Sequence, residues 1–195
     1  SGGSTQQVYH NEVPVMPTNP TRPGHTFLGW YTTAAGTTPW NPATTITEAT
    51  TYYAKWQINT YTVSFNANGG SGGSSQSVVY GSTASYPPTP SAPSAAYDVA
   101  GWYTNASGTT SWNQSTPISG DTIIYAKWSL KTFTVSFNAN GGSVSPTSRS
   151  VTYGSSIGSL PTPSRTGYTF NGWYTSTSGG SAVGGSTTVT SNQTV

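Results

Sequence analysis

The sequence predicts a β-rich fold built from tandem copies of one small module, and three observations lead to this prediction. A Gly-Trp-Tyr motif recurs at residues 29–31, 101–103 and 172–174, which gives a period of about 71 to 72 residues. Apolar residues alternate with Ser or Thr in the segments that repeat best. Asn-Gly pairs and Pro-rich stretches separate these segments, as is typical of turns between strands.

The first half of each copy is expected to be a hairpin. Residues 61–65 and 133–137 alternate aromatic or aliphatic side chains with Thr or Ser, which predicts strands with one buried face. The Asn-Gly pairs at 68–69 and 140–141 tolerate positive φ, so they predict tight turns directly after these strands.

The second half of each copy is expected to contain little helix. Residues 155–160 could form one helical turn capped by serine, and the prolines at 161–163 predict an extended connector because proline lacks an amide donor. Each copy is therefore predicted to be a β-rich α+β module with about four strands. The further strands are expected at residues 76–80, 122–128, 148–153 and 168–174.

Two repeated motifs define the boundaries of the copies. Tyr-Thr-Val-Ser-Phe, or Phe-Thr-Val-Ser-Phe, opens a copy, and the Tyr-Ala-Lys-Trp motif at 53–56 and 125–128 closes it. The pair Val8-Tyr9 aligns with 79–80 and 152–153. The predicted copies are residues 1–56, which lack the first strand, residues 57–128, which are complete, and residues 129–195, which lack the last strand.

The composition is typical of a folded exterior protein. Ser and Thr make up 65 of the 195 residues, and only 5% of residues are charged, against about 25% in an ordinary soluble domain. A net charge of +2 without a basic stripe disfavours nucleic-acid binding. This segment shows no membrane span and no signal peptide. The absence of cysteine excludes disulfides and is compatible with a secreted bacterial protein.

The repeated apolar positions divide into an expected core and an expected surface set. Burial of a Trp or Phe in so small a module contributes several kcal/mol, so the most regular positions should be core. The other aromatic residues should be partly exposed, where they pack between modules or stack on sugar rings. The expected core residues are Trp30, Val63, Phe65, Trp102, Val135, Phe137 and Trp173. The expected interface or glycan-binding aromatics are Tyr31, Trp40, Trp56, Tyr103, Trp112, Trp128 and Tyr174.

Groups for catalysis or metal binding are nearly absent from the sequence. The carboxylates fall at different places in different copies, so no acid and base pair recurs and no calcium cage can repeat. The histidines His10 and His25 occur only in the first copy. We therefore expect no enzymatic activity, no cofactor and no metal site. The carboxylates are Glu12, Glu48, Asp98 and Asp121.

Three motifs in a fixed order give the chain a specific family resemblance. The opening at 61–70 and 133–142, the Arg-x-Gly-aromatic-Thr-Phe-x-Gly-Trp-Tyr segments and the Tyr-Ala-Lys-Trp close resemble the Listeria-Bacteroides repeat, also called the internalin B-repeat. The resemblance covers essentially the whole chain. It implies tandem, ubiquitin-like β-grasp modules on bacterial or archaeal surface proteins, without catalytic residues. The chain departs from the pattern at 94–100, and Val183 lies near the position of Trp40 and Trp112.

Two functional hypotheses follow. In the first, the modules stack end to end into an extracellular stalk or filament, an elongated semi-rigid rod, because only about four residues, 57–60 or 129–132, link them. Incomplete end copies could then be completed by strands from a neighbouring chain. In the second, exposed aromatics bind a host receptor or a cell-surface polysaccharide with avidity. Both hypotheses place the protein at the cell surface.

Overall fold

The computed structural model describes residues 3–195, so the first two residues of the first predicted copy lie outside the described residues. The chain divides into two compact units. One comprises residues 3–64, 74–87 and 113–123, and the other comprises residues 65–73, 88–112 and 124–195. The boundary between these units passes through the middle repeat, so each junction between consecutive repeats lies inside one unit.

The first repeat contains one antiparallel strand pair, β1 (His25–Tyr31) and β2 (Tyr53–Ile58). Trp30 lies opposite Ala54, and Phe27 lies opposite Trp56. The ring of Phe27 makes edge-to-face contacts with Trp30 and Trp56, at centroid distances of 5.6 and 5.5 Å. The Tyr-Ala-Lys-Trp motif thus forms the partner strand of the Gly-Trp-Tyr motif.

The middle repeat contains a four-stranded sheet with the order β4-β3-β6-β5. The pair of β5 and β6 repeats the register of the first repeat, with Trp102 opposite Ala126 and Val99 opposite Trp128. The four strands predicted for a complete copy are therefore present. They are β3 (Thr60–Asn66), β4 (Ser74–Val79), β5 (Tyr97–Tyr103) and β6 (Thr122–Leu130).

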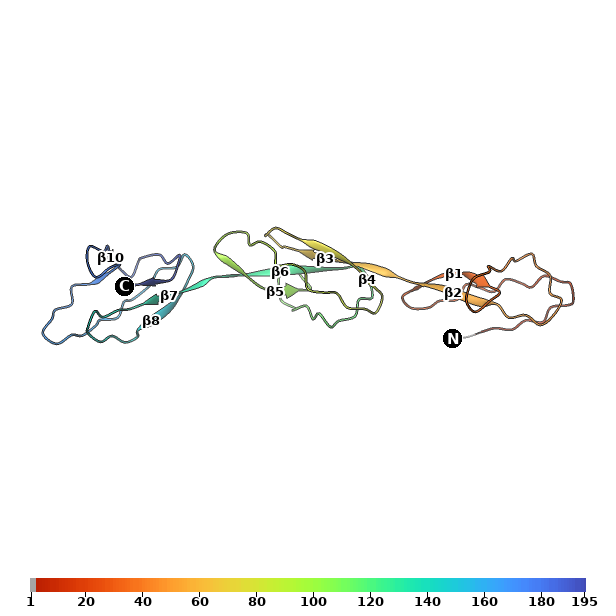
Figure 1. Ribbon diagram of the computed structural model, residues 1–195, viewed down its shortest axis with the longest axis horizontal. Helices are drawn as coiled ribbons and strands as arrows, with labels where there is room; N and C mark the ends of the chain where they lie inside the picture. Colours follow the sequence, from red (N-terminus) through yellow and green to blue (C-terminus); the bar gives the residue numbers. More distant parts are fainter. Residues whose placement is uncertain (1–2) are drawn as a thin grey trace. The chain divides into compact units, whose positions relative to one another are not determined.

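The third repeat contains a three-stranded sheet with the order β11-β7-β8 (Figure 1). Strands β7 (Thr132–Ser136) and β8 (Ser148–Thr152) are antiparallel, whereas β11 (Gln193–Thr194) runs parallel to β7. A separate short pair joins β9 (Trp173–Tyr174) to β10 (Ala182–Val183). The predicted strand at 168–174 is therefore regular only over its last two residues.

The glycine of each Gly-Trp-Tyr motif allows a β-bulge. Strand register shifts between Phe27 and Gly29 and again between Val99 and Gly101. The φ angles of Gly29, Gly101 and Gly172 are 129°, 141° and 133°, and residues with a Cβ rarely adopt this region of φ. The motif thus combines a glycine, which its positive φ angle requires, with the large apolar side chain of the tryptophan that follows.

The predicted Asn-Gly turns are confirmed. Asn68 and Gly69 have φ angles of 48° and 98°, and Asn140 and Gly141 have φ angles of 46° and 86°. In the first of these turns the Asn68 amide donates to Asn66 Oδ1 at 2.7 Å. Asn and Gly are the residues that adopt such angles at the lowest cost.

The prediction of a helical turn at 155–160 is wrong, because residues 3–195 contain no helix. The amide of Ile157 donates to Thr187 O at 3.0 Å, and the amide of Gly158 donates to Gly185 O at 2.9 Å. Gly158 has a φ angle of 85°. These donors pair with a distant segment instead of with carbonyls one turn earlier, so the capped helix cannot form.

The structure shifts the alignment of the first repeat by one residue. The Gly81 amide donates to Ile118 O at 2.8 Å, the Gly154 amide to Val189 O at 2.8 Å, and the Asn11 amide to Ile46 O at 2.8 Å. Asn11 also has a positive φ, 67°. His10, and not Tyr9, therefore corresponds to Tyr80 and Tyr153. Asparagine in place of glycine concealed the correct alignment.

Candidate functional site: the junctions between repeats

A single residue joins the first and second repeats. Strand β2 ends at Ile58 and β3 begins at Thr60, so only Asn59 lies between them. The Asn59 amide donates to Gly24 O at 2.8 Å, and Asn59 O accepts from the Tyr80 amide at 2.9 Å. Because Gly24 precedes β1 and Tyr80 follows β4, the linking residue is hydrogen-bonded to both repeats.

The second junction has the same backbone arrangement. Lys131 alone separates β6 from β7. Its amide donates to Ala96 O at 2.8 Å, and its carbonyl accepts from the Tyr153 amide at 2.8 Å. The sequence predicted linkers of about four residues, and the structure corrects this to one residue, because the strands of both repeats extend toward the link.

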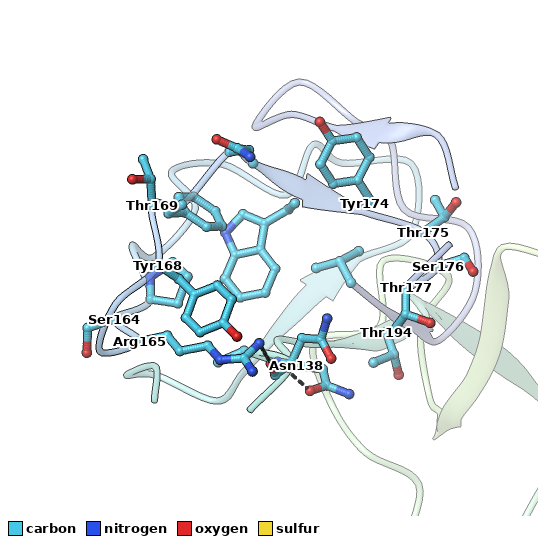
Figure 2. Close-up of a pocket in the computed structure, with 18 residues that line it drawn as sticks. Asn138, Ser164, Arg165, Tyr168, Thr169, Tyr174, Thr175, Ser176, Thr177 and Thr194 are labelled. Carbon is cyan, nitrogen blue, oxygen red and sulfur yellow. Dashed lines mark hydrogen bonds between the residues drawn. The ribbon is translucent and has the colours of Figure 1, made fainter. Parts of the chain in front are cut away.

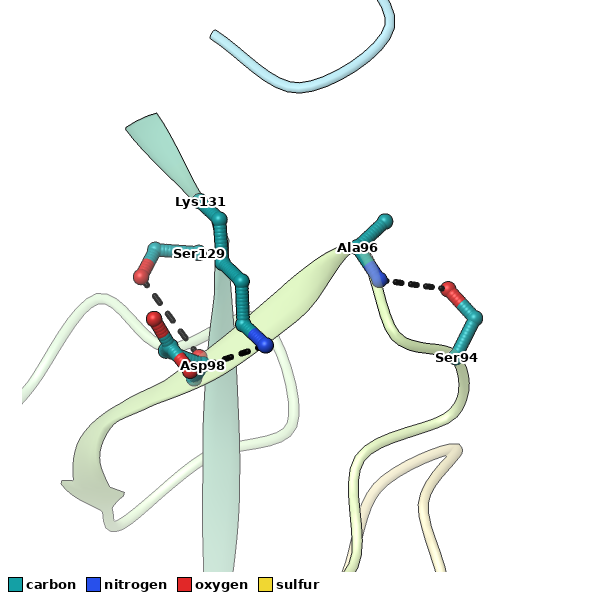
Figure 3. Close-up of polar contacts among 5 residues, drawn as sticks. All are labelled: Ser94, Ala96, Asp98, Ser129 and Lys131. Atoms are coloured by element: carbon teal, nitrogen blue, oxygen red, sulfur yellow. Dashed lines mark hydrogen bonds and ion pairs between the residues drawn. The ribbon is translucent and has the colours of Figure 1, made fainter. Parts of the chain in front are cut away.

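The side chains at the two junctions differ. Thr26 Oγ1 donates to Asn59 Oδ1 at 2.7 Å in the first junction. In the second, Lys131 Nζ lies 3.7 Å from an Asp98 carboxylate oxygen (Figure 3). The side chains of Lys131 and Asp98 are 33% and 66% exposed, so solvent screens this pair and it stabilises little. The two junctions therefore share their backbone hydrogen bonds and differ in their side-chain contacts.

Aromatic rings pack beside each linking residue. The ring of Tyr80 lies 6.4 Å from that of Tyr61 and 6.5 Å from that of His25, measured between centroids. In the second junction Tyr153 lies 6.3 Å from Phe133. A side chain on Gly24 would overlap the Tyr80 ring, and Gly24 has a φ angle of 67°. Glycine there allows the two repeats to approach closely.

The expected core positions lie in the interior to different degrees. Val63 and Val135 are fully buried, and Phe65, Phe137 and Trp173 are nearly so. The Phe65 ring lies 5.2 Å from Trp102 and 5.5 Å from Trp112. Trp30 and Trp102 are half-buried.

The expectation that all the other aromatics are partly exposed was wrong for two tryptophans. Trp40 and Trp112 are 8% and 7% exposed, because each follows a short hairpin that folds it back beside the Gly-Trp-Tyr strand. Val183 occupies the same place in the third repeat, opposite Trp173. The remaining members of the set, Tyr31, Trp56, Tyr103 and Trp128, are half-buried, and Tyr174 is exposed.

The lysine of the Tyr-Ala-Lys-Trp motif fastens the hairpin that follows Gly-Trp-Tyr. Lys127 Nζ donates to Gly108 O at 2.9 Å and lies 5.1 Å from the centre of the Tyr103 ring. Lys55 makes the same contacts with Gly36 and Tyr31, at 2.8 and 4.8 Å. Sequence analysis missed this role, although the fixed Lys and Tyr spacing was visible.

Asp121 and Asn192 occupy equivalent places and each accept a hydrogen bond from the backbone of the first strand of their repeat. Asp121 Oδ1 accepts from the Thr62 amide at 2.8 Å, and Asn192 Oδ1 accepts from the Thr134 amide at 2.8 Å in the third repeat.

Residues 3–195 contain no group of three or more His, Asp or Glu side chains able to hold a metal ion. Over the same residues no helix is long and apolar enough to cross a membrane.

The third repeat carries an open pocket of about 590 Å³ (Figure 2). The turn at 138–140, the segment 168–177 and Val195 form its walls. The Arg165 guanidinium lies 3.9 Å from the centre of the Tyr168 ring and donates through Nη1 to Asn140 O at 2.8 Å. The pocket therefore combines aromatic rings, amide side chains and one cation.

The shared register and bulge of the β1/β2 and β5/β6 pairs, together with the two like junctions, define the chain as a tandem array of small β modules. The chain belongs to the Listeria-Bacteroides repeat domain family, whose model matches residues 1–55, 61–127 and 133–195. No solved structure matches the chain.

Three relatives share part of their length with this chain. Two are Evansella cellulosilytica proteins named as a membrane protein and a Gly-rich membrane protein. They are 43% and 36% identical over 81% of this chain and 24% and 18% of their own length. The third, Internalin H of Listeria monocytogenes, is 36% identical over 60% of this chain and 22% of its own length. The chain thus spans about a quarter or less of these relatives.

Proposed function

We propose that this chain is a structural repeat segment of an extracellular cell-surface stalk or filament, in which successive modules are stacked end to end. The observation that carries the proposal is the junction, which recurs with the same backbone hydrogen bonds at Asn59 and Lys131. One linking residue bonded on both sides leaves little freedom for a hinge. The names of the relatives, a membrane protein and an internalin, favour a surface location.

The modules are proposed to be β-grasp-like, with an extended connection in place of the usual helix. In the third repeat the first strand pairs antiparallel with β8 and parallel with β11, and this arrangement supports a β-grasp sheet. The 155–160 segment, where a helix was expected, makes its bonds to residues 185–188 instead.

Adhesion is the second candidate and has less support. Two of its expected ligand-binding residues, Trp40 and Trp112, are buried, and Tyr31 and Tyr103 lie under lysine side chains. Tyr174, which is 43% exposed, is the member of the set best placed to contact a ligand.

The proposal can be tested by ¹⁵N relaxation on the whole chain. A variant with four Gly and Ser residues inserted after Lys131 serves as a flexible reference, and a variant with the same insertion after Gly120 controls for the insertion itself. Gly120 is suitable because an added Cβ there would meet nothing within 4 Å. The parent and the Gly120 control should show coupled tumbling of the repeats on either side of Lys131. Independent tumbling in the parent, equal to that of the Lys131 insertion, would contradict a stalk.

A further inference from the structure

The first and last strands of the middle repeat are neighbours at the centre of its sheet. In the order β4-β3-β6-β5, strand β3 begins directly after the link at Asn59, and β6 ends directly before the link at Lys131. Tension that passes along the array must therefore enter this repeat through β3 and leave it through β6. The two central strands receive the pull directly.

Contacts at both ends show that β3 and β6 run parallel. Asp121, directly before β6, accepts from the Thr62 amide near the start of β3 at 2.8 Å. At the other end, Trp128 Nε1 donates to Ala67 O at 2.9 Å and to Asn68 O at 3.1 Å, just after β3. The corresponding strands of the third repeat, β7 and β11, are also parallel. Tension at the two links thus pulls β3 and β6 in opposite directions along their length, which is shear.

Shear is the direction of pull in which a strand pair resists most. The hydrogen bonds between two sheared strands must lengthen together, whereas the bonds of a pair peeled from one end break one after another. Because a single hydrogen bond contributes a modest net free energy, the resistance depends on how many must break at once. Water is excluded from the inner face of this pair, since Val63, Phe65, Ile124 and Ala126 are no more than 2% exposed. Broken bonds on that face are therefore not replaced at once by bonds to water.

The side chain of Asn68 adds a bond across the far end of the pair. Its amide donates to Ala126 O in β6 and to Ala106 O in the hairpin that follows β5, each at 2.9 Å. The indole of Trp128 bonds back to the same turn. Displacement of β6 along β3 must break these side-chain bonds together with those of the backbone.

A second side-chain bond closes the near end of the pair and recurs in the third repeat. The Asp121 bond to the Thr62 amide has a charged acceptor, which makes it stronger than a bond between neutral groups. In the third repeat Asn192 Oδ1 accepts from the Thr134 amide at 2.8 Å. The bond is thus present in both repeats although the residue that makes it differs.

We infer that the β3 and β6 pair is a mechanical clamp, which allows the middle repeat to transmit pulling force along the array without opening. The clamp consists of the parallel strand pair, the Asp121 bond to Thr62, and the bonds that Asn68 and Trp128 make between the turn and β6. The inference rests on the proposed function, because a stalk or filament at a cell surface is pulled along its length. It adds resistance to tension to the rigid connection between repeats.

The test is single-molecule force spectroscopy at constant load on the whole chain, which has no cysteine and so accepts handles at chosen sites. Handles on the exposed positions Thr60→Cys and Thr132→Cys pull the ends of the β3 and β6 pair and load it in shear. Handles on Ala95→Cys and Thr132→Cys pull at one end of the antiparallel β5 and β6 pair and peel it apart. At equal load the middle repeat should survive at least about tenfold longer in shear, because several bonds must break together.

Three variants in the shear geometry separate the clamp from general stability. Asp121→Ala removes the acceptor of the Thr62 amide and should shorten the lifetime at least about tenfold. Asp121→Asn keeps an acceptor, as Asn192 does in the third repeat, and should stay within about threefold of the parent. Lys127→Met is the matched control, because its bond to Gly108 O lies outside the clamp; it should change the shear lifetime by less than about twofold.

Equal lifetimes in the two pulling geometries would overturn the inference. So would a shear lifetime that Asp121→Ala leaves unchanged, or one that Asp121→Ala and Lys127→Met shorten equally, since the loss would then reflect general destabilisation. The tumbling experiment applies no load and reports on the junction at Lys131. A rigid junction with a weak middle repeat contradicts only the clamp, and a mobile junction with a strong middle repeat contradicts only the stalk.

Discussion

Replacement of Gly24 by alanine should loosen the first junction selectively. The new Cβ would overlap the Tyr80 ring, and the residue has a φ angle of 67°. The backbone strain costs about 1–2 kcal/mol. Displacement of the Tyr80 ring from His25 and Tyr61 costs roughly another 0.5–1.5 kcal/mol for each aromatic pair. The total is about 2–5 kcal/mol, of which about 0.5–1.5 kcal/mol comes from the His25 and Tyr80 contact across the junction.

The third repeat offers a matched control for the strain alone. Gly167 occupies the corresponding position, with a φ angle of 78°, and a Cβ on it would meet nothing within 4 Å. Gly167→Ala should therefore cost only the strain, about 1–2 kcal/mol. The difference in free energy between the two variants is the cost of displacing the Tyr80 ring from His25 of the first repeat and from Tyr61 of the second repeat.

Native-state hydrogen exchange is the appropriate assay, because global unfolding of a repeat array need not be two-state. The amides of Asn59 and Tyr80, which bridge the junction, should exchange about 5- to 150-fold faster in Gly24→Ala than in Gly167→Ala. If both variants leave these amides equally protected, the packing of Tyr80 on Gly24 does not hold the junction and the reasoning is wrong.

Three further substitutions test the stability of the middle repeat, measured by native-state hydrogen exchange of its own strand amides. Phe65→Ala should destabilise the middle repeat by about 3–5 kcal/mol, because the ring is buried, and a loss below 1 kcal/mol would contradict its place in the core. Lys127→Met should cost about 1–2 kcal/mol through its hydrogen bond and its contact with Tyr103, whereas unchanged amide exchange would show that the lysine does not fasten the hairpin. Asp98→Asn should change stability by less than about 0.5 kcal/mol, since its pair with Lys131 is exposed; a larger, salt-dependent loss would reveal an ionic junction.

The sequence alone was sufficient for the features that depend on local pattern. The period, the closing strands and the Asn-Gly turns follow from residue types that act within a few positions of one another, and Asn68 and Asn140 adopt the expected positive φ. The glycine of Gly-Trp-Tyr was recognised as a landmark, but its bulge depends on pairing with a strand about 25 residues later in the chain.

Features that depend on distant segments could not be predicted. A capped helical turn was predicted at residues 155–160, but the amides of Ile157 and Gly158 bond to Thr187 and Gly185. Trp40 and Trp112 are surrounded in sequence by Gly, Pro, Ser and Thr, which suggests exposure, and only the hairpin that returns them to Trp30 and Trp102 buries them. The one-residue link at Asn59 likewise required the strand ends to be known.

The most direct test of the central claim, that a bonded one-residue link holds consecutive repeats together, is a spin-label distance measurement across the first junction. Thr51→Cys and Ser75→Cys provide two exposed sites on either side of Asn59 in a chain without other cysteines. The account predicts one narrow distance distribution that broadens in Gly24→Ala and in a variant with four Gly and Ser residues inserted after Asn59. A parent distribution as broad as that of the insertion variant would contradict it.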